Sequence, residues 1–292
     1  MSLTKPSECT LITTTADWGW HCAIDYPRVK VYTVTQRPPK PTSGSVPIES
    51  APTATSPHLR GPRNHRHVSV ERLYRVPFPD NHFDVVSART LFLILRSSAK
   101  NPRNPHAPGI DEYDRVLDEC MRVLKPGGYL EYMLFDSAVV NAGPLAEELY
   151  PRFARGLQES GRDPEPTARW ITRLYASGFT DVKRAWSFLP LAPPAEKPRV
   201  PEKDHVDQGE DPAEQVRARM QTWGGDEAGA AETGTSKDVA AVTGLLSGWV
   251  WEKWLRTAGI FEVETVGNVI EEAKDRGSGL RNLVGYAMKP LE

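Results

Sequence analysis

The chain has 292 residues, a formal net charge of -2 and 39% hydrophobic residues. The near-neutral balance provides no overall attraction to nucleic acid, and no apolar run reaches the roughly 20 residues that span a bilayer. The first residues also lack the apolar centre of a secretory signal peptide. We therefore expect a soluble intracellular protein, cytoplasmic or nuclear, whose partners include neither a membrane nor a nucleic acid.

The cysteines and histidines show no pattern of a metal site. Cys9, Cys22 and Cys120 are odd in number and have no CxxC spacing, so we expect reduced core thiols rather than disulfides or bound zinc. Three histidines lie in or next to a proline-rich stretch without a carboxylate or cysteine beside them: His58, His65 and His67. The sequence therefore predicts no metal centre.

Prolines divide the chain into regular and irregular parts. Half of the 26 prolines fall in two stretches, and proline disfavours helix interiors and inner strands because it has no amide donor. We expect a Pro-rich loop insertion over residues 37–63 and a disordered insertion over residues 190–238. The remainder is long enough for one core, so residues 1–292 are predicted to form a single domain.

Strands and helices are expected to alternate outside these insertions. Apolar, β-branched runs predict strands at residues 9–15, 29–35, 67–70, 83–87, 129–135, 179–188 and 283–288. A turn is expected over residues 16–20, and helices over residues 21–26, 111–124, 144–158, 167–177, 239–257 and 261–275. This alternation predicts an α/β, Rossmann-like doubly wound sheet, with a helical insertion over residues 239–276 before the last strand.

The helix expected over residues 239–257 is rich in tryptophan. Its predicted apolar stripe, which we expect to pack on the sheet, consists of Val242, Leu245, Leu246, Trp249, Val250, Trp254 and Leu255. Trp251 lies away from the centre of the stripe. Core packing is the plain interpretation of Trp251, and contact with a substrate, a protein partner or the next helix is the alternative.

Two motifs carry a family resemblance. Residues 76–86 read VPFPDNHFDVV and residues 119–131 read ECMRVLKPGGYLE. In this order and spacing they resemble the class I S-adenosylmethionine-dependent methyltransferases, particularly the UbiE-like branch abundant in filamentous fungi. The resemblance is strongest over residues 67–135. It implies a seven-stranded sheet whose last strand is antiparallel, and S-adenosyl-L-methionine as the cofactor.

The resemblance also implies where the cofactor would bind. The family's three glycine positions after the first strand carry Thr14, Ala16 and Trp18, and the place of its ribose-binding acid carries no acid. The implied cofactor-binding residues are Thr14, Ala16, Asp17, Trp18, Gly19, Thr35, Gln36, Glu71, Arg72, Leu73, Ser87, Ala88 and Arg89. Among these, Glu71 is the better of two candidates to accept a hydrogen bond from the adenine amine, the other being Arg72.

The resemblance predicts methyl transfer to a small-molecule or protein acceptor that the sequence does not identify. Asp136 is the candidate base by analogy, and capping of the next turn is its plain alternative. The alternative function is a catalytically inactive scaffold or regulatory subunit. A protein partner is expected at the helix of Trp251, or as a replacement for the helices that precede the first strand in the family. A nicotinamide oxidoreductase is disfavoured because Gly-x-Gly-x-x-Gly is absent.

Overall fold

The computed structural model describes residues 8–12, 17–37, 61–97, 100–101, 104–108, 111–193 and 236–292. Most of both predicted insertions, at residues 37–63 and 190–238, lies outside the described residues. Their loop character and disorder therefore stay predictions.

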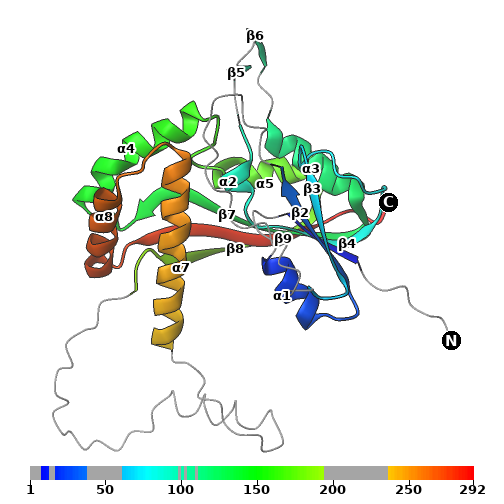
Figure 1. The fold of residues 1–292 in the computed structure, drawn as a ribbon. Helices are drawn as coiled ribbons and strands as arrows, with labels where there is room; N and C mark the ends of the chain where they lie inside the picture. The colour runs from blue at the N-terminus through cyan, green and yellow to red at the C-terminus, as the bar shows by residue number, and fades with distance from the viewer. Residues whose placement is uncertain are drawn as a thin grey trace, which may run out of the picture.

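One large sheet organises the chain, and its strand order is β3-β2-β1-β4-β7-β9-β8 (Figure 1). The strands are β1 (Glu8–Ile12), β2 (Lys30–Gln36), β3 (His65–Val70), β4 (Phe83–Ala88), β7 (Leu124–Val140), β8 (Thr180–Pro190) and β9 (Gly279–Met288). The strands from β3 to β7 pair in parallel, and β9 runs antiparallel between β7 and β8. A separate two-stranded sheet, which the sequence did not predict, joins β5 (Lys100–Asn101) and β6 (Asn104–Pro108).

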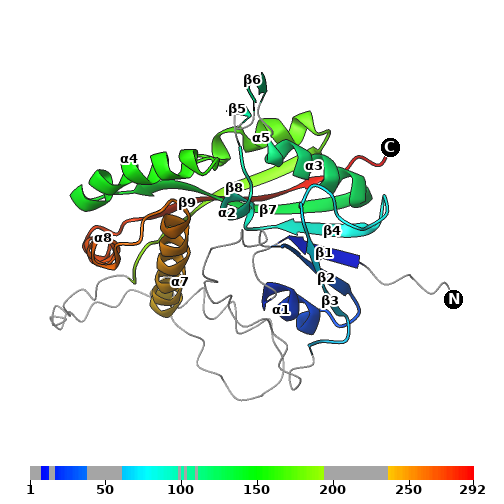
Figure 2. The ribbon, with the colours of Figure 1, turned by 45° about the horizontal axis from the view of Figure 1, so that its top comes forward.

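Helices cover both faces of the sheet. They are α1 (Asp17–Asp25), α2 (Leu91–Ile94), α3 (Glu112–Val123), α4 (Pro144–Glu159), α5 (Thr167–Ala176), α7 (Ser236–Thr257) and α8 (Val263–Arg276). Figures 1 and 2 show α3, α4 and α5 above the sheet and α1 below it. The predicted α/β architecture is therefore confirmed. Among the described residues, no helix is long and apolar enough to cross a membrane.

Local sequence explains where α3 begins and ends. The Asp111 carboxylate accepts a hydrogen bond from the backbone N–H of Tyr113, which caps the first turn. At the other end, Nζ of Lys289 donates to the carbonyl oxygens of Met121 and Leu124. One face of α3 is buried, and burial raises the pKa of the Cys120 thiol on that face to about 12. The helix leads directly into β7, against which it packs.

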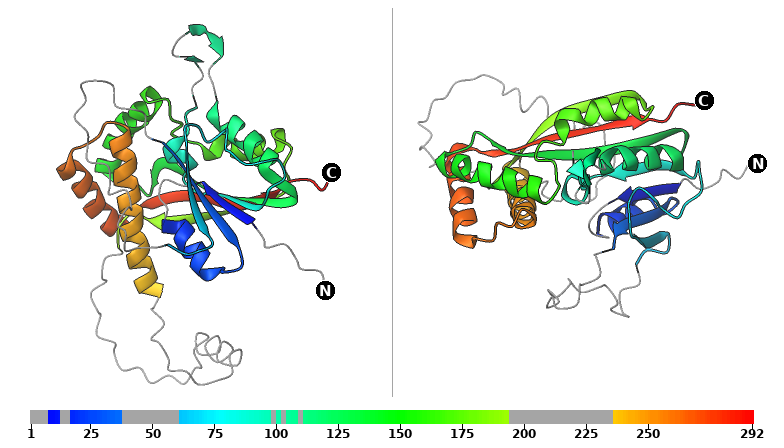
Figure 3. Two further views of the ribbon diagram at one scale, coloured as in Figure 1. Left: turned by 45° about the vertical axis from the view of Figure 1, so that its right-hand side comes forward. Right: turned by 90° about the horizontal axis from the view of Figure 1, so that it is seen from above.

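Two helices lie at the carboxyl end of β7, beyond the point where β4 ends. Val140 of β7 and Pro190 of β8 both pair with Gly279, the first residue of β9. Since α8 ends at Arg276, it lies at the carboxyl end of β7, and both views of Figure 3 place α7 next to it. In α/β sheets, ligands bind at this carboxyl edge.

The packing of α7 corrects the predicted stripe. Trp251 and Trp254 are buried, and the Trp254 ring contacts Phe92 and Phe153. By contrast Trp249 is 66% exposed, as are three further members of the predicted stripe at 50% or more: Val242, Leu245 and Leu246. The prediction that the whole stripe packs on the sheet is wrong, and the plain interpretation of Trp251 as a core residue is right.

Glycines explain this reversal. A Cβ at Gly244 would collide with the backbone of Ala192 and Pro193, and one at Gly248 would lie 3.0 Å from the carbonyl oxygen of Leu191. The face of α7 that carries these glycines therefore approaches the end of β8 closely. The apolar face that looked like the core face points away from that contact.

Candidate functional site

The order in which the chain adds strands to the sheet reverses between β1 and β4. From β1 the chain continues to β2 and β3 on one side, and then returns to β4 on the other side of β1. The carboxyl ends of these two neighbouring strands therefore border the crevice in which doubly wound sheets bind their ligands. Thr14 and Ala16, in the segment after β1, lie outside the described residues.

Three side chains from different elements meet beside this crevice. The guanidinium of Arg89, just after β4, lies over the ring of Trp18 in α1, with its Cζ 4.1 Å from the ring centre. It also forms a salt bridge with Glu131 of β7, through Nη2 and, at 3.3 Å, Nε. Ser87 donates to the same carboxylate at 2.5 Å. The structure thus brings together three of the predicted residues, Trp18, Ser87 and Arg89, around a carboxylate that the sequence analysis missed.

The first turn of α1 corrects the prediction for residues 16–20. Asp17, Trp18 and Gly19 belong to the helix rather than to a turn before it. A Cβ at Gly19 would collide with Oγ1 of Thr33 and approach Nε2 of His65. Gly19 therefore allows α1 to pack closely on β2 and β3, which is one of the roles of glycine in Rossmann-type turns.

Two histidines beneath and beside α1 pair with threonines. Nε2 of His65 lies 2.8 Å from Oγ1 of Thr33, and Nε2 of His67 lies 2.8 Å from Oγ1 of Thr35. Burial, together with the nearby charges of His67 and Arg66, lowers the pKa of His65 below its ordinary value of 6.5. These bonds give both histidines a role in joining β2 to β3.

A cavity opens at the carboxyl ends of β2 and β3. It measures about 520 Å³, and its lining includes Arg37, Ser69, Glu71 and Arg72. The side-chain amide of Gln36 donates to the carbonyl oxygen of Glu71 at 3.1 Å, which ties the two strand ends together. The predicted residues Gln36, Glu71 and Arg72 are thus neighbours.

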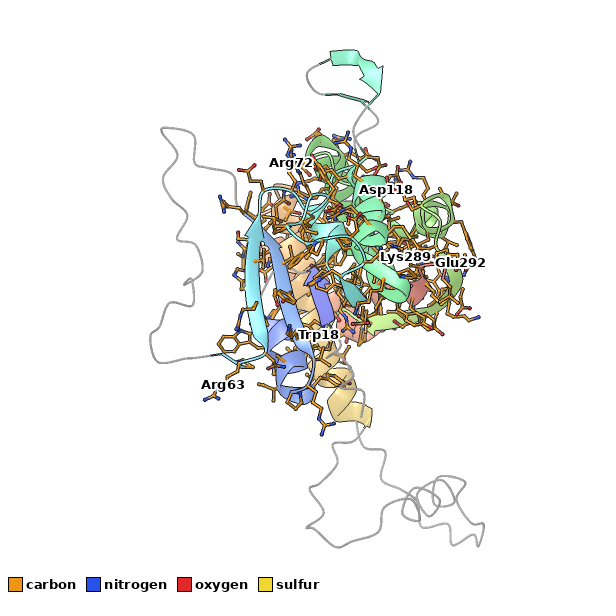
Figure 4. The ribbon with its side chains drawn as sticks, turned by 90° about the vertical axis from the view of Figure 1, so that its right-hand side faces the viewer. Trp18, Arg63, Arg72, Asp118, Lys289 and Glu292 are labelled. Carbon is orange, nitrogen blue, oxygen red and sulfur yellow. The ribbon has the colours of Figure 1, made fainter. Side chains whose placement is uncertain are left out.

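A second cavity near β3 lies at the wrong end for a ligand of the carboxyl edge. It is lined by Trp20, Ile24 and the residues just before β3. Figure 4 labels Arg63 and Arg72 at opposite ends of β3, and Arg63 belongs to this second cavity. The cavity at Arg72 is therefore the candidate site.

Three further predicted residues and the candidate base are buried or form hydrogen bonds within the protein. Leu73 and Ala88 belong to the hydrophobic core, and Arg72 bonds the hydroxyl of Tyr74. Asp136, the candidate base, is 4% exposed and accepts hydrogen bonds from Thr167 N–H, Thr167 Oγ1 and Arg281 Nη2. The Asp136 carboxylate thus holds the first turn of α5, rather than the next turn of the chain that its predicted alternative role named.

The cavity fits the nucleoside of S-adenosylmethionine. Ligand pockets typically measure about 300–1,000 Å³, a range that includes this cavity. The Glu71 carboxylate provides an acceptor for an exocyclic amine. Burial raises the pKa of the Cys22 thiol, which lies near the charges of Arg89, Glu131 and Asp25.

A comparison with models of known protein families finds one match, in the segment that contains the candidate site residues. A family model described as a methyltransferase domain matches residues 50–131. The matched segment includes β3, the cavity residues Glu71 and Arg72, and the partners Arg89 and Glu131. A search of the curated proteins finds no match.

Solved structures are similar at low identity. The [4+2]-cyclase SpnF is 16% identical with a TM-score of 0.47, over 99% of this chain and 78% of that one. The YcgJ protein of Bacillus subtilis is 15% identical with a TM-score of 0.48, over 98% and 93%. Phosphoethanolamine N-methyltransferase 2 of Haemonchus contortus, solved with S-adenosyl-L-methionine, is 11% identical with a TM-score of 0.43, over 99% and 50%.

Proposed function

We propose that this protein is an S-adenosylmethionine-dependent methyltransferase acting on a small-molecule or protein acceptor, with the UbiE-like branch as its nearest group. The observation that carries the proposal is the methyltransferase-domain match over residues 50–131. It is supported by the cavity at the carboxyl ends of β2 and β3, within and beside the matched segment.

In this proposal the cavity holds the nucleoside of the cofactor. Glu71 accepts a hydrogen bond from the adenine amine, and Gln36 and Thr35 lie where the ribose hydroxyls approach the end of β2. The bound cofactor supplies a methyl group already activated on a sulfonium. The chain's own residues therefore need to bind the cofactor and the acceptor, orient them and exclude water, because proximity and alignment lower most of the barrier.

The acceptor is proposed to enter at the carboxyl edge on the side of α7. This helix lies there, and the face that carries Trp249 is exposed. Trp249 thus takes the place that the sequence analysis gave to Trp251 as a contact for an acceptor or a protein partner. No general base is assigned, since the Asp136 carboxylate is engaged with Thr167 and Arg281.

Calorimetric titration with S-adenosylmethionine and S-adenosylhomocysteine tests the proposal. We expect saturable heat for both ligands and about a tenfold weaker affinity for Glu71→Ala, because a charged acceptor is lost. Glu148→Ala is the matched control, since Glu148 lines a groove between α4 and α8 instead. An absence of heat at millimolar ligand would reject the proposal, and the inactive-scaffold alternative would then be preferred.

A further inference from the structure

The outer edge of the sheet carries aromatic and cationic side chains on one face. β8 is the last strand of the sheet, and its residues 183–190 pair with β9 without a break in register. Alternate residues of a strand share a face, so Arg184, Trp186 and Phe188 project from the same side of β8. Phe188 pairs with Arg281 of β9, whose guanidinium lies over the Trp186 ring with its Cζ 4.5 Å from the ring centre. We call these four side chains the β8 platform.

The β8 platform is open to solvent. Trp186 is 48% exposed, Phe188 is 45% exposed and the Arg281 side chain is 55% exposed, and Arg184 is exposed as well. A Cβ at Gly279 would collide with the Phe188 ring, so glycine at the start of β9 makes room for this ring on the sheet. A ligand can therefore reach both rings and both guanidinium groups from the same side.

The arginines of the platform are only partly neutralised. Arg281 donates through Nη2 to the buried Asp136 carboxylate at 2.8 Å, and no described residue accepts a hydrogen bond from its other nitrogens. Arg184 forms no salt bridge with any residue that the structure describes. One carboxylate thus accompanies two guanidinium groups, and the platform keeps a positive charge.

Exposed rings beside unpaired arginines are complementary to single-stranded nucleic acid. Aromatic rings stack on bases of any sequence, and arginines bind the phosphates. An acidic peptide would satisfy the arginines but not the rings, whereas an apolar peptide would leave the charge of Arg184 without a partner. The net charge of -2 describes the chain as a whole and does not oppose a local excess of cations.

We propose that the β8 platform binds a short single-stranded segment of nucleic acid. Bases stack on Trp186 and Phe188, and Arg184 and Arg281 hold the phosphates. The buried Asp136 carboxylate orients Arg281 for this contact from within the protein. The platform lies beyond β7 on the side away from β4, so the inference does not rest on the proposed function.

The same two strands provide a matched control on their other face. Tyr286 of β9 is 41% exposed and pairs with Lys183 of β8, so an aromatic residue again lies next to a cation. Lys183 forms a salt bridge with Asp181 at 2.9 Å, and its charge is therefore compensated. Tyr286→Ala removes an exposed ring from these strands and leaves the platform intact.

Fluorescence anisotropy of a fluorescein-labelled oligouridylate of about ten nucleotides tests the proposal on the full chain. We expect saturable binding that weakens about sevenfold when NaCl rises from roughly 50 to 200 mM, because two phosphates are held. Trp186→Ala and Phe188→Ala should each weaken binding at least about fivefold. Arg184→Gln should reduce the salt dependence, and Tyr286→Ala should bind like the unchanged protein.

The outcomes decide between the possible partners. An absence of saturable binding by the unchanged protein would overturn the inference, as would equal losses for Trp186→Ala and Tyr286→Ala. Polyglutamate that competes as well as unlabelled oligouridylate at equal charge would assign the platform to an acidic protein instead. Because the two ring variants are made separately, Phe188→Ala decides the matter if Trp186→Ala does not fold. The affinity for S-adenosylhomocysteine should be the same in all of these variants, and a parallel loss would place the effect at the candidate site.

Discussion

Two stacks of the same composition occur on opposite sides of β7. Each consists of a tryptophan ring, an arginine over it and a carboxylate paired with the arginine. Trp18, Arg89 and Glu131 form the first, and their charged side chains are about one-third exposed. In the second, which Trp186, Arg281 and Asp136 form, the carboxylate is 4% exposed.

The difference lies in what else the carboxylate contacts. Asp136 is committed to the first turn of α5 through the N–H and hydroxyl of Thr167. Glu131 has only the Ser87 hydroxyl besides Arg89 among its described partners. Burial of the Asp136 carboxylate makes it a structural connection between β7, β9 and α5, although Arg281 is 55% exposed. The Glu131 carboxylate is 35% exposed and can exchange partners with a ligand.

The largest effect is expected for Asp136→Asn. This change removes a buried charge that satisfies Thr167 and Arg281, so the free energy of unfolding should fall by about 3 kcal/mol. Urea unfolding followed by circular dichroism measures it. The affinity for S-adenosylhomocysteine should not change at temperatures where the variant is folded. A loss below about 1 kcal/mol would remove the contrast between the stacks.

The next effect concerns the helix that carries Trp18. Gly19→Ala should lower the free energy of unfolding by about 1–3 kcal/mol, because the new methyl group collides with Thr33 and His65. Alanine normally stabilises a helix relative to glycine. At Gly267 of α8 nothing lies within 4 Å of the new Cβ, so Gly267→Ala should stabilise by about 0.5–1 kcal/mol. Equal signs for the two variants would contradict the packing.

Glu131→Gln should have a small effect on stability. Its ion pair with Arg89 is partly solvated, so we expect a loss of less than about 1 kcal/mol in the free energy of unfolding. The same urea titration used for Asp136→Asn gives a direct comparison. A loss as large as that of Asp136→Asn would mean that the exposed stack is structural too.

The smallest effect is a dependence on pH at the base of α1. The folded state favours neutral His65, because burial, His67 and Arg66 lower its pKa. Its contribution to stability is therefore complete above pH 6.5 and is lost as the pH falls below 6.5 toward the folded pKa. Unfolding measured at pH 7.5 and 5.5 should show a larger decrease for the unchanged protein than for His65→Gln. Equal decreases would exclude His65 as the cause.

Periodicity predicted most of the regular elements. The helix predicted over residues 111–124 is α3, Glu112–Val123, and the one predicted over residues 144–158 is α4, Pro144–Glu159. In both cases an apolar face at helical spacing meets the sheet, so hydropathy and packing agree. The short helix α1 was placed too late, because its first turn, from Asp17 to Trp20, combines glycine with tryptophan and resembles a turn.

Hydropathy failed where small residues make the contact. In α7 the buried face includes Gly244, Ser247 and Gly248, which allow close approach to the end of β8. A hydropathy pattern gives such residues little weight. It therefore placed the exposed Val242, Leu245, Leu246 and Trp249 in the core together with Trp254 and Leu255, which are buried. Only the tertiary contact with Ala192 and Pro193 decides which face is buried.

The candidate site was only partly predictable. The family motifs led to Arg89 and Glu71, which the structure places beside the crevice and in the cavity. Glu131 was missed, although a single acid in the apolar run of residues 129–135 was a signal that a cation must lie opposite. The pairing of β4 with β7 aligns Ser87 with Glu131, and that register is not visible in a sequence.

The position of β9 has a consequence for synthesis of the chain. Its residues, Gly279–Met288, separate β7 from β8, which have no other strand between them. While the ribosome is still translating α7 and α8, β8 therefore has no strand beside it and β7 has one open edge. Unpaired edges attract other strands, so the nascent chain needs protection at these two strands until β9 emerges and inserts between them.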